Sequence, residues 1–382
     1  MKNVQNVIAC MLLAVGMFSC SPSDKQANED AQFKDYKIIG YIAGWKGVDT
    51  SEIHAEKLTH INYAFANVVN GRVIEGEGRE EQDKQNLALL RSLKSKNPDL
   101  KILISVGGWT WSKGFSDAVL TEEGRKVLTA SAIDYLLRHD LDGLDFDWEY
   151  PAYPGDDNPY RPEDKDNFIL MLQSVRNALD SLGALTGKHY LQTIATGGFT
   201  EVLEVNDLGE AQKYLDFINI MAYDLIVQSW RDTTGHHTNL YPSKFSNRSS
   251  EKTVREHIQA GVPASKLVMG MAFYGRSWKS VIPENNGLGQ KGTGSRGFPY
   301  MQIVELMEQG GYERFWDEEA QAPYLWNSLD SIFITFEDPQ SLRAKVKFVR
   351  DNGLAGGMFW EYHEDSKDRA LLNALYDAFE GR

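Results

Sequence analysis

The chain has 382 residues, enough for one large α/β barrel or two ordinary domains with a sizeable core. Hydrophobic residues make up 42% and charged residues 25% of it, which is typical of a soluble globular protein and excludes disorder of the whole chain. The formal net charge of −14 argues against nucleic acid and anionic lipid as main partners, because both attract basic surfaces. A neutral or cationic ligand suits this charge better.

The first twenty residues have the pattern of an export signal. Lys2 gives a short basic end, and the apolar run 7–18 is shorter than the ~20 residues of a membrane-spanning helix. The run ends at Ser19-Cys20, which resembles the lipobox of bacterial lipoproteins. We expect a signal peptide over 1–19, a lipid anchor at Cys20, the sole membrane contact, and a flexible tether over 20–33. An ordinary cleaved signal, and plain secretion, is the alternative.

From residue 36 onward, short apolar runs alternate with helical patterns. Helices are expected over 81–96, 121–138 and 163–182. Strands that are apolar on both faces and alternate with helices indicate parallel βαβ units. Eight such strands predict a (β/α)₈ TIM barrel, with a doubly wound open sheet as the alternative. The eight predicted strands are Lys37–Ala43, Thr59–Ala66, Lys101–Val106, Gly143–Trp148, Tyr190–Ala195, Phe217–Ala222, Leu267–Phe273 and Gly356–Trp360.

The interval between the seventh and eighth strands is too long for a single crossover helix. Residues 278–338 contain Gly and Pro punctuation, aromatic clusters and a β-like run over 331–336. We therefore predict a small α+β insertion there, followed by a barrel helix over 339–352. The catalytic barrel would comprise residues 34–277 and 339–382.

The fourth strand carries three carboxyl groups on one face. In Asp142-Gly-Leu-Asp-Phe-Asp-Trp-Glu149, side chains alternate with period two, so Asp145, Asp147 and Glu149 share a face opposite large apolar residues. Like charges that close in a partly dry site cannot all ionise, so at least one pKa must rise. A protonated carboxyl beside ionised ones is what a general acid for glycosidic cleavage requires. A metal site is the alternative, although no His lies nearby in sequence.

This segment resembles the signature of family 18 glycoside hydrolases, the chitinases. Four further segments resemble motifs of that family at the expected strands, and the insertion resembles the small α+β domain of one large chitinase subfamily. The four are Ser105-Val-Gly-Gly-Trp109, Met221-Ala-Tyr-Asp224, Phe273-Tyr-Gly-Arg276 and Gly357-Met-Phe-Trp360. The resemblance covers nearly all of residues 36–382.

The resemblance implies a retaining, substrate-assisted reaction. Glu149 would protonate the glycosidic oxygen and then act as base, while the substrate's own N-acetyl oxygen serves as nucleophile. Asp147 would orient the acetamido group, Asp145 would share a proton or hydrogen bond with Asp147, and Tyr223 would bond to the acetamido oxygen. Asp224 would support the same subsite. The remaining substrate-binding walls would be Tyr41, Phe65, Trp109, Met221, Tyr274, Arg276 and the sugar-floor residue Trp360.

The implied substrate is chitin or an oligosaccharide containing N-acetylglucosamine, bound by a monomer without cofactor or metal. Trp111 and Trp230 are further candidates for sugar contact. An endo-β-N-acetylglucosaminidase acting on N-glycans is the alternative within the same chemistry. A binding protein without catalysis is the alternative of another class, and the presence of Glu149, Asp147 and Tyr223 disfavours it.

Overall fold

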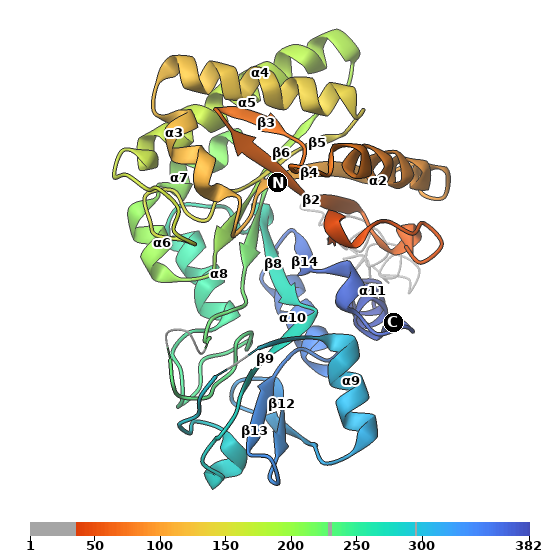
Figure 1. Cartoon of the computed structure of the whole chain (residues 1–382), viewed down its shortest axis with the longest axis vertical. Helices are drawn as coiled ribbons and strands as arrows, with labels where there is room; N and C mark the ends of the chain where they lie inside the picture. The colour runs from red at the N-terminus through yellow and green to blue at the C-terminus, as the bar shows by residue number, and fades with distance from the viewer. Residues whose placement is uncertain (1–35, 228–230, 295) are drawn as a thin grey trace, which may run out of the picture. The chain divides into compact units, whose positions relative to one another are not determined.

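The computed structural model describes residues 36–227, 231–294 and 296–382. Residues 36–382 form one compact unit, in which eight parallel strands close into a ring surrounded by helices (Figure 1). The order around the ring is β1-β14-β8-β7-β6-β5-β4-β2, and β1 pairs with β2 to close it. The predicted (β/α)₈ barrel is therefore confirmed. The expected signal peptide, Cys20 and Trp230 lie outside the described residues.

Each barrel strand overlaps one of the eight predicted from the sequence. Their bounds are β1 Lys37–Ala43, β2 His60–Val69, β4 Lys101–Gly107, β5 Gly143–Asp147, β6 Leu191–Gly197, β7 Phe217–Met221, β8 Leu267–Ala272 and β14 Gly356–Trp360. A short strand that was not predicted, β3 Arg72–Ile74, pairs antiparallel with the end of β2.

The helices between the strands follow local signals. In α5, Phe168, Leu172, Val175 and Leu179 form one buried stripe at helical spacing. Asp338 begins α10 with a capping box, followed by a proline at the first helical position. The helices are α2 Glu80–Ser92, α3 Phe115–Val119, α4 Glu122–Arg138, α5 Asp164–Thr186, α6 Thr200–Val205, α7 Leu208–Ala211, α8 Ser250–Gln259, α10 Pro339–Asp351 and α11 Ala370–Phe379. Among the described residues, no helix combines the length and the apolar composition that a membrane span requires.

Two apolar layers lie on the two faces of the barrel strands, one outside the barrel and one inside it. Leu144 and Phe146 of β5 belong to the large layer between strands and helices. A smaller layer fills the barrel itself and includes Tyr41, Phe217 and Met358. The alternation along β5 therefore turns Asp145 toward the barrel interior, where it is fully buried.

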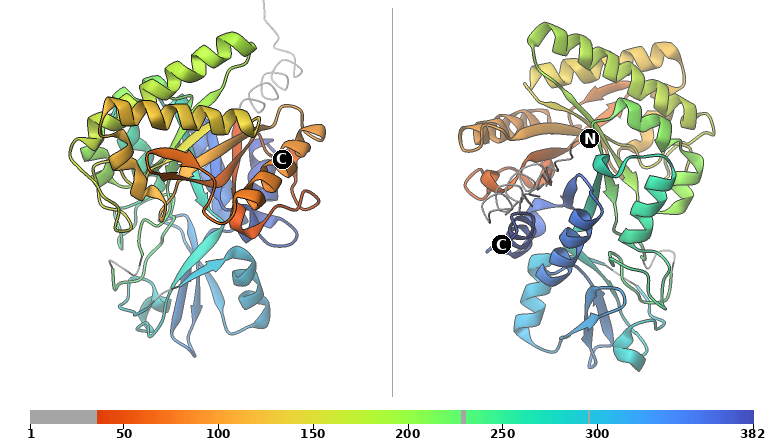
Figure 2. Two further views of the ribbon diagram at one scale, coloured as in Figure 1. Left: turned by 45° about the horizontal axis from the view of Figure 1, so that its top comes forward. Right: turned by 180° about the vertical axis from the view of Figure 1, so that it is seen from behind.

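The segment between β8 and β14 forms a second, antiparallel sheet of order β10-β9-β13-β12-β11. Its first strand begins at Tyr274, four residues before the expected start of the insertion at 278. The elements are β9 Tyr274–Trp278, β10 Gly297–Pro299, α9 Tyr300–Gln309, β11 Glu313–Asp317, β12 Ala322–Asn327 and β13 Ile332–Thr335. Both views in Figure 2 place this sheet at the opposite end of the unit from α4 and α5. A separate small core that includes Trp278, Trp326 and Phe333 holds it together.

Candidate active site

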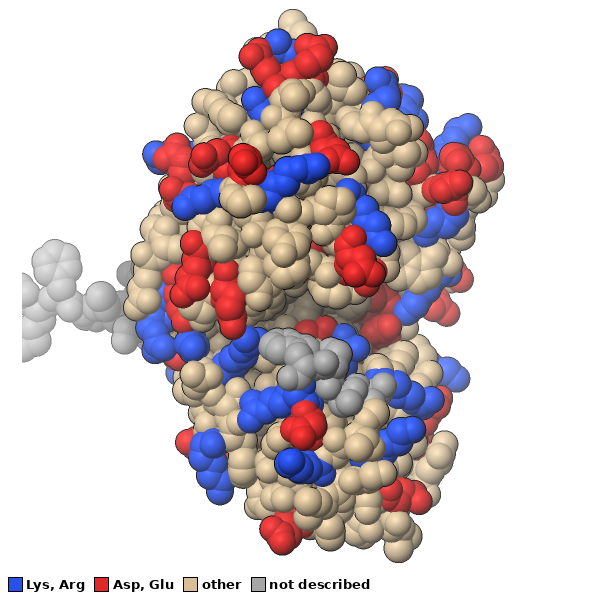
Figure 3. Space-filling model, turned by 60° about the vertical axis from the view of Figure 1, so that its left-hand side comes forward, with Lys and Arg blue, Asp and Glu red and all other residues tan. Residues whose placement is uncertain are grey.

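A cleft of 1380 Å³ opens at the carboxyl ends of the barrel strands. Figure 3 shows this face hollowed near its centre, with Asp and Glu atoms visible at the hollow. Of the residues predicted for the site, Asp145 alone does not line the cleft, because it lies deeper in the barrel. The predicted residues that line it are Tyr41, Phe65, Trp109, Asp147, Glu149, Met221, Tyr223, Asp224, Tyr274, Arg276 and Trp360, together with the further candidate Trp111.

Parallel strands bring these side chains together, since their carboxyl ends meet at one end of a barrel. Asp147, Met221 and Trp360 are the last residues of β5, β7 and β14. Glu149 follows β5 by two residues and therefore keeps the face of Asp147.

A β-bulge turns Phe65 toward the cleft. Along the pairing of β2 with β4, Ala64 faces Ser105 and Ala66 faces Val106, so Phe65 is the extra residue. A bulge re-aims one side chain, and both Ala64 and Phe65 pack in the barrel interior. The peptide bond between them is cis.

Asp145 lies at the centre of a buried hydrogen-bond network that joins five strands. Its Oδ2 accepts bonds from Tyr41 Oη and Ser105 Oγ, both at 2.8 Å. Its Oδ1 accepts from Thr193 Oγ1 at 2.6 Å and from Asn219 Nδ2 at 3.2 Å. Burial raises the pKa of Asp145, and the four bonds oppose that rise.

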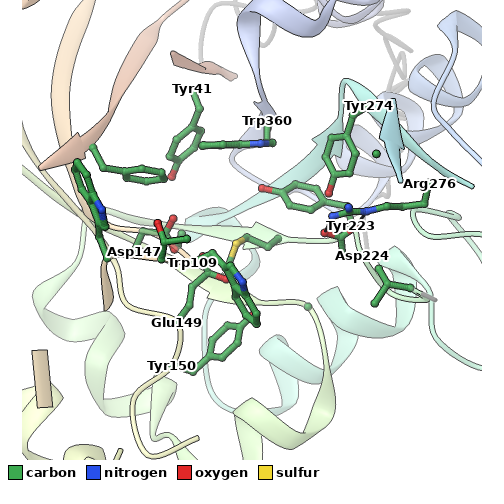
Figure 4. A pocket seen from close by; sticks show the side chains of 18 of the residues that line it. Tyr41, Trp109, Asp147, Glu149, Tyr150, Tyr223, Asp224, Tyr274, Arg276 and Trp360 are labelled. Atoms are coloured by element: carbon green, nitrogen blue, oxygen red, sulfur yellow. Dashed lines mark hydrogen bonds and ion pairs between the residues drawn. The ribbon is translucent and has the colours of Figure 1, made fainter. Parts of the chain in front are cut away.

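Asp147 and Glu149 are buried carboxyl groups that face the cleft, and Figure 4 shows Asp147 between Tyr41 and Glu149. Burial raises the pKa of Asp147 well above its ordinary value, and the charges of Glu149 and Asp145 add to the rise. Burial also raises the pKa of Glu149, to about 7. Because each group disfavours ionisation of the other, the pair holds a proton near neutral pH.

Asp145 and Asp147 are not joined by a hydrogen bond within the described part of the chain. Asp147 Oδ1 has no hydrogen-bond partner among the described residues. A buried acceptor without a partner is costly unless a ligand supplies the donor. The sharing of a proton between Asp145 and Asp147 stays a prediction, and Asp147 is ready to accept a bond from a bound molecule.

Two residues that no sequence motif indicated, Ser112 and Asn158, hold the backbone around Glu149 in place. Ser112 Oγ accepts a bond from Glu149 N at 2.9 Å and donates to Gly108 O at 2.9 Å. Asn158 Nδ2 donates to Glu149 O at 2.9 Å. The sequence offers no signal for either, because the loops that carry them meet β5 only in the folded barrel.

The other side of the cleft holds a carboxylate of opposite character. Asp224 receives two bonds from Arg276, with Nε to Oδ1 at 2.7 Å and Nη2 to Oδ2 at 2.5 Å (Figure 4). His237 Nδ1 lies 3.4 Å from Asp224 Oδ1. Burial would raise the pKa of Asp224, but His237 and the Arg276 guanidinium outweigh it and lower that pKa. Asp224 is therefore ionised at every pH at which Glu149 can act as an acid.

Between the Asp147–Glu149 pair and Asp224, the Tyr223 phenol reaches the open space of the cleft. The only hydrogen-bond partner of its hydroxyl among the described residues is Met358 Sδ at 4.0 Å, too weak a contact to occupy the hydroxyl. Burial, with the nearby carboxylates, raises the pKa of Tyr223 well above its ordinary value, so it stays a proton donor. The hydroxyl can thus donate a bond to a ligand beside Asp147.

Aromatic rings form a continuous wall along the cleft. The Trp360 ring centroid lies 5.8 Å from that of Tyr41, and Trp360 stacks on Phe65 at 5.5 Å with an interplanar angle of 17°. Trp45, which is 47% exposed, continues the row at 6.3 Å from both Phe65 and Trp360. Flat apolar faces in this arrangement suit sugar rings.

No cluster of three or more His, Cys, Asp or Glu in the described part of the chain could hold a metal ion. The adjacent His236 and His237 are both buried and face different partners, Asp317 and Asp224. The described residues that line the cleft include carboxyl, phenol, guanidinium and aromatic groups.

The family model for glycosyl hydrolases family 18 matches residues 37–365. The chain belongs to this family. Chitinase A1 of Niallia circulans is 34% identical over 94% of this chain, which spans 60% of that longer protein. Among solved structures, a family 18 N-acetylglucosaminidase from Paenibacillus barengoltzii has a TM-score of 0.83 and 41% identity, covering 90% of this chain and 99% of its own. Chitinase ChiA74 from Bacillus thuringiensis has a TM-score of 0.85 and 33% identity, covering 91% of this chain and 70% of its own.

The cleft of this family 18 hydrolase extends beyond the residues that the motifs indicated. Several further lining residues lie outside the motifs, most of them on loops, with Glu201 on α6 and Phe298 on β10, and no spacing in the sequence connects them. They are Trp45, Arg79, Thr110, Tyr150, Tyr153, Phe199, Glu201, Arg248, Phe298 and Glu364. Their number shows that loop shape, rather than the strand motifs, forms most of the outer cleft.

Proposed function

We propose that this family 18 hydrolase cleaves β-1,4-linked N-acetylglucosamine polymers or oligomers with retention at the anomeric carbon. The observation that carries the proposal is Glu149, whose pKa of about 7 lets it hold a transferable proton in a cleft lined by aromatic rings. The names of chitinase A1 and ChiA74 support this substrate class.

In the first step, a sugar rests on Trp360 with its acetamido group near Asp147 and Tyr223. Glu149 gives its proton to the glycosidic oxygen, and the bond between that oxygen and the anomeric carbon breaks. The substrate's acetamido oxygen forms the new bond to the anomeric carbon, giving an oxazolinium ion. The free acceptor atom of Asp147 takes a hydrogen bond from the acetamido N–H and stabilises the positive charge.

In the second step, the Glu149 carboxylate removes a proton from water. The water oxygen attacks the anomeric carbon and displaces the acetamido oxygen, which restores the acetamido group and the protonated Glu149. Two inversions at one carbon give net retention. Tyr223 donates a hydrogen bond to the acetamido oxygen and so aligns it for attack in the first step.

The proposal is tested by hydrolysis of aryl glycosides of N-acetylglucosamine oligomers, with the anomer of the first product read by NMR. We expect release of the β-anomer, and loss of turnover in Glu149→Gln with retained oligomer binding. Glu308→Gln, an exposed substitution on α9, is the matched control. Full activity in Glu149→Gln, or the α-anomer as first product, would contradict the mechanism.

A second candidate is release of single N-acetylglucosamine units from short oligomers. The Paenibacillus barengoltzii N-acetylglucosaminidase favours it, since this chain covers 99% of that structure at 41% identity. Monomer as the dominant product from every oligomer length would select this candidate, whereas internal cleavage of long oligomers would select a chitinase. Cleavage of N-glycoproteins without cleavage of chitin oligomers would instead select the N-glycan alternative.

We also propose that the protein is exported and anchored through a lipid on Cys20, because Ser19-Cys20 ends an apolar run of signal-peptide length. Metabolic labelling with a fatty-acid analogue should mark the wild-type chain and leave Cys20→Ser unlabelled. Label retained in Cys20→Ser would place the lipid on another residue and contradict an anchor at Cys20. A wild-type chain without label would leave ordinary secretion as the explanation. The monomeric state expected from the sequence is checked in the same preparation by light scattering.

A further inference from the structure

Arg79 lies at the far end of the aromatic wall, before α2. Its guanidinium carbon is 4.7 Å from the Trp111 ring centroid and 6.0 Å from that of Trp45. All three side chains line the cleft. Stacking on two indoles holds a guanidinium by its faces and leaves its N–H edges free to bond.

The position of Arg79 depends on a glycine beneath it. Arg79 N donates to Gly76 O at 2.8 Å, which closes a tight turn. A Cβ on Gly76 would lie 2.5 Å from Arg79 Nη2 and 2.7 Å from Trp111 Cη2. The stacked arrangement therefore requires a residue without a side chain at position 76.

Within the described residues, the Arg79 side chain has no ion pair and no hydrogen bond. Asp83, a buried carboxylate in the first turn of α2, is already occupied, since it accepts from Tyr63 Oη at 2.6 Å and from Gly76 N at 2.9 Å. A guanidinium stays charged at every physiological pH and carries five N–H donors. Arg79 thus brings a fixed cation with unused donors to an acidic cleft.

The row of rings relates Arg79 to the reacting sugar. Trp360 stacks on Phe65, and Trp45 lies 6.3 Å from both. Arg79 follows Trp45 in this row. A sugar that touches Arg79 is therefore linked to the reacting sugar on Trp360 but lies beyond it.

We propose that Arg79 is a specificity-determining residue that binds the acetamido oxygen of a sugar beyond the reacting one and rejects glucosamine there. This inference rests on the proposed function. An amide carbonyl is the strongest uncharged acceptor of an N-acetylglucosamine chain, and its bond to a guanidinium is charge-assisted. Removal of the acetyl group replaces that acceptor by an ammonium group, which the fixed positive charge repels.

The test uses binding to Glu149→Gln protein, so that turnover does not obscure affinity. Chitotetraose and four tetramers, each with glucosamine at a different position, are titrated by tryptophan fluorescence. We expect one position, other than that of the reacting sugar, at which glucosamine weakens binding by about tenfold or more. Adding Arg79→Ala should reduce this penalty to less than about threefold.

Two further variants separate the cation from the fold of the loop. Gly76→Ala keeps Arg79 but displaces it, and should also reduce the penalty. Arg255→Ala, which removes an exposed arginine of α8, is the matched control and should keep it. A penalty that survives Arg79→Ala, or equal affinity for all distal glucosamine tetramers in the parent, would overturn the role of Arg79 alone. Absence of binding to chitotetraose itself would refute the proposed function as well.

Discussion

Removing the Asp145 carboxylate should destabilise the barrel from its centre. Asp145 accepts four hydrogen bonds, from Tyr41, Ser105, Thr193 and Asn219, and each donor comes from a different strand. In Asp145→Ala all four donors lose this acceptor in a region without solvent access. Buried donors that lose their partner cost more than the net gain of the bond itself.

The size of the effect follows from the number of bonds. At about 1 kcal/mol for each bond, and more where the acceptor is charged, Asp145→Ala should lower the free energy of unfolding by about 4 kcal/mol. That is a large part of the roughly 5–15 kcal/mol that stabilises a typical domain. Asp145→Asn keeps the shape and one acceptor oxygen, and the hydroxyls of Tyr41 and Ser105 can turn to accept. Its cost should be about 1–2 kcal/mol.

Urea denaturation at pH 7, followed by tryptophan fluorescence, measures both variants. Asp99→Ala, which removes an exposed carboxylate, is the control and should stay within about 0.5 kcal/mol of wild type. The reasoning fails if Asp145→Ala lies within about 1 kcal/mol of wild type. It also fails if Asp145→Asn costs as much as Asp145→Ala, since the acceptor oxygen and the shape that Asn retains would then contribute nothing to stability.

Three further results are expected. Because Glu149 must carry its proton to act as acid, kcat/KM should fall as pH rises through about 7, which a pH–rate profile checks. Burial raises the pKa of Glu149 from 4.5 to about 7, so the folded state holds a proton that the unfolded state has lost. The free energy of unfolding should therefore fall as pH rises from 4.5 to 7, which urea denaturation at several pH values checks. Arg276→Lys should raise the pKa of Asp224 and lower kcat/KM by at least about tenfold, read by steady-state kinetics, because lysine cannot bond through two nitrogens. Lys345→Met should lower the free energy of unfolding by about 3–5 kcal/mol, measured in urea, because buried Glu337 loses its cationic partner. Adding Glu337→Leu should restore most of the lost stability.

The fold and the location of the site could be predicted because they follow from local periodicity. Alternating apolar and acidic residues along 143–149 allow one orientation in a closed barrel, and the structure shows Leu144 outside and Asp145 inside. Strand ends must then meet at one end, which is why the motif residues share the cleft.

The remainder depends on contacts between residues far apart in the sequence. Thr193 and Asn219 look like ordinary strand residues, and their bonds to Asp145 exist only once β5, β6 and β7 are neighbours. The bulge at Phe65 follows from pairing with β4 and not from the sequence of β2 alone. Arg79 occupies the cleft because Gly76, three residues earlier, leaves room for it, a relation that no periodic pattern reveals.

The charge arrangement of the cleft explains how one net-acidic site can supply both a proton and a fixed negative charge. Asp224 is paired with Arg276 and lies beside His237, so its pKa is lowered although it is partly buried. Glu149 has no cationic partner among the described residues, so burial raises its pKa and the charge of Asp224 raises it further. Two carboxyl groups whose environments move their pKa values apart can hold opposite protonation states at one pH. Arg276 therefore acts on Glu149 indirectly: by keeping Asp224 ionised, it helps to keep the acid protonated.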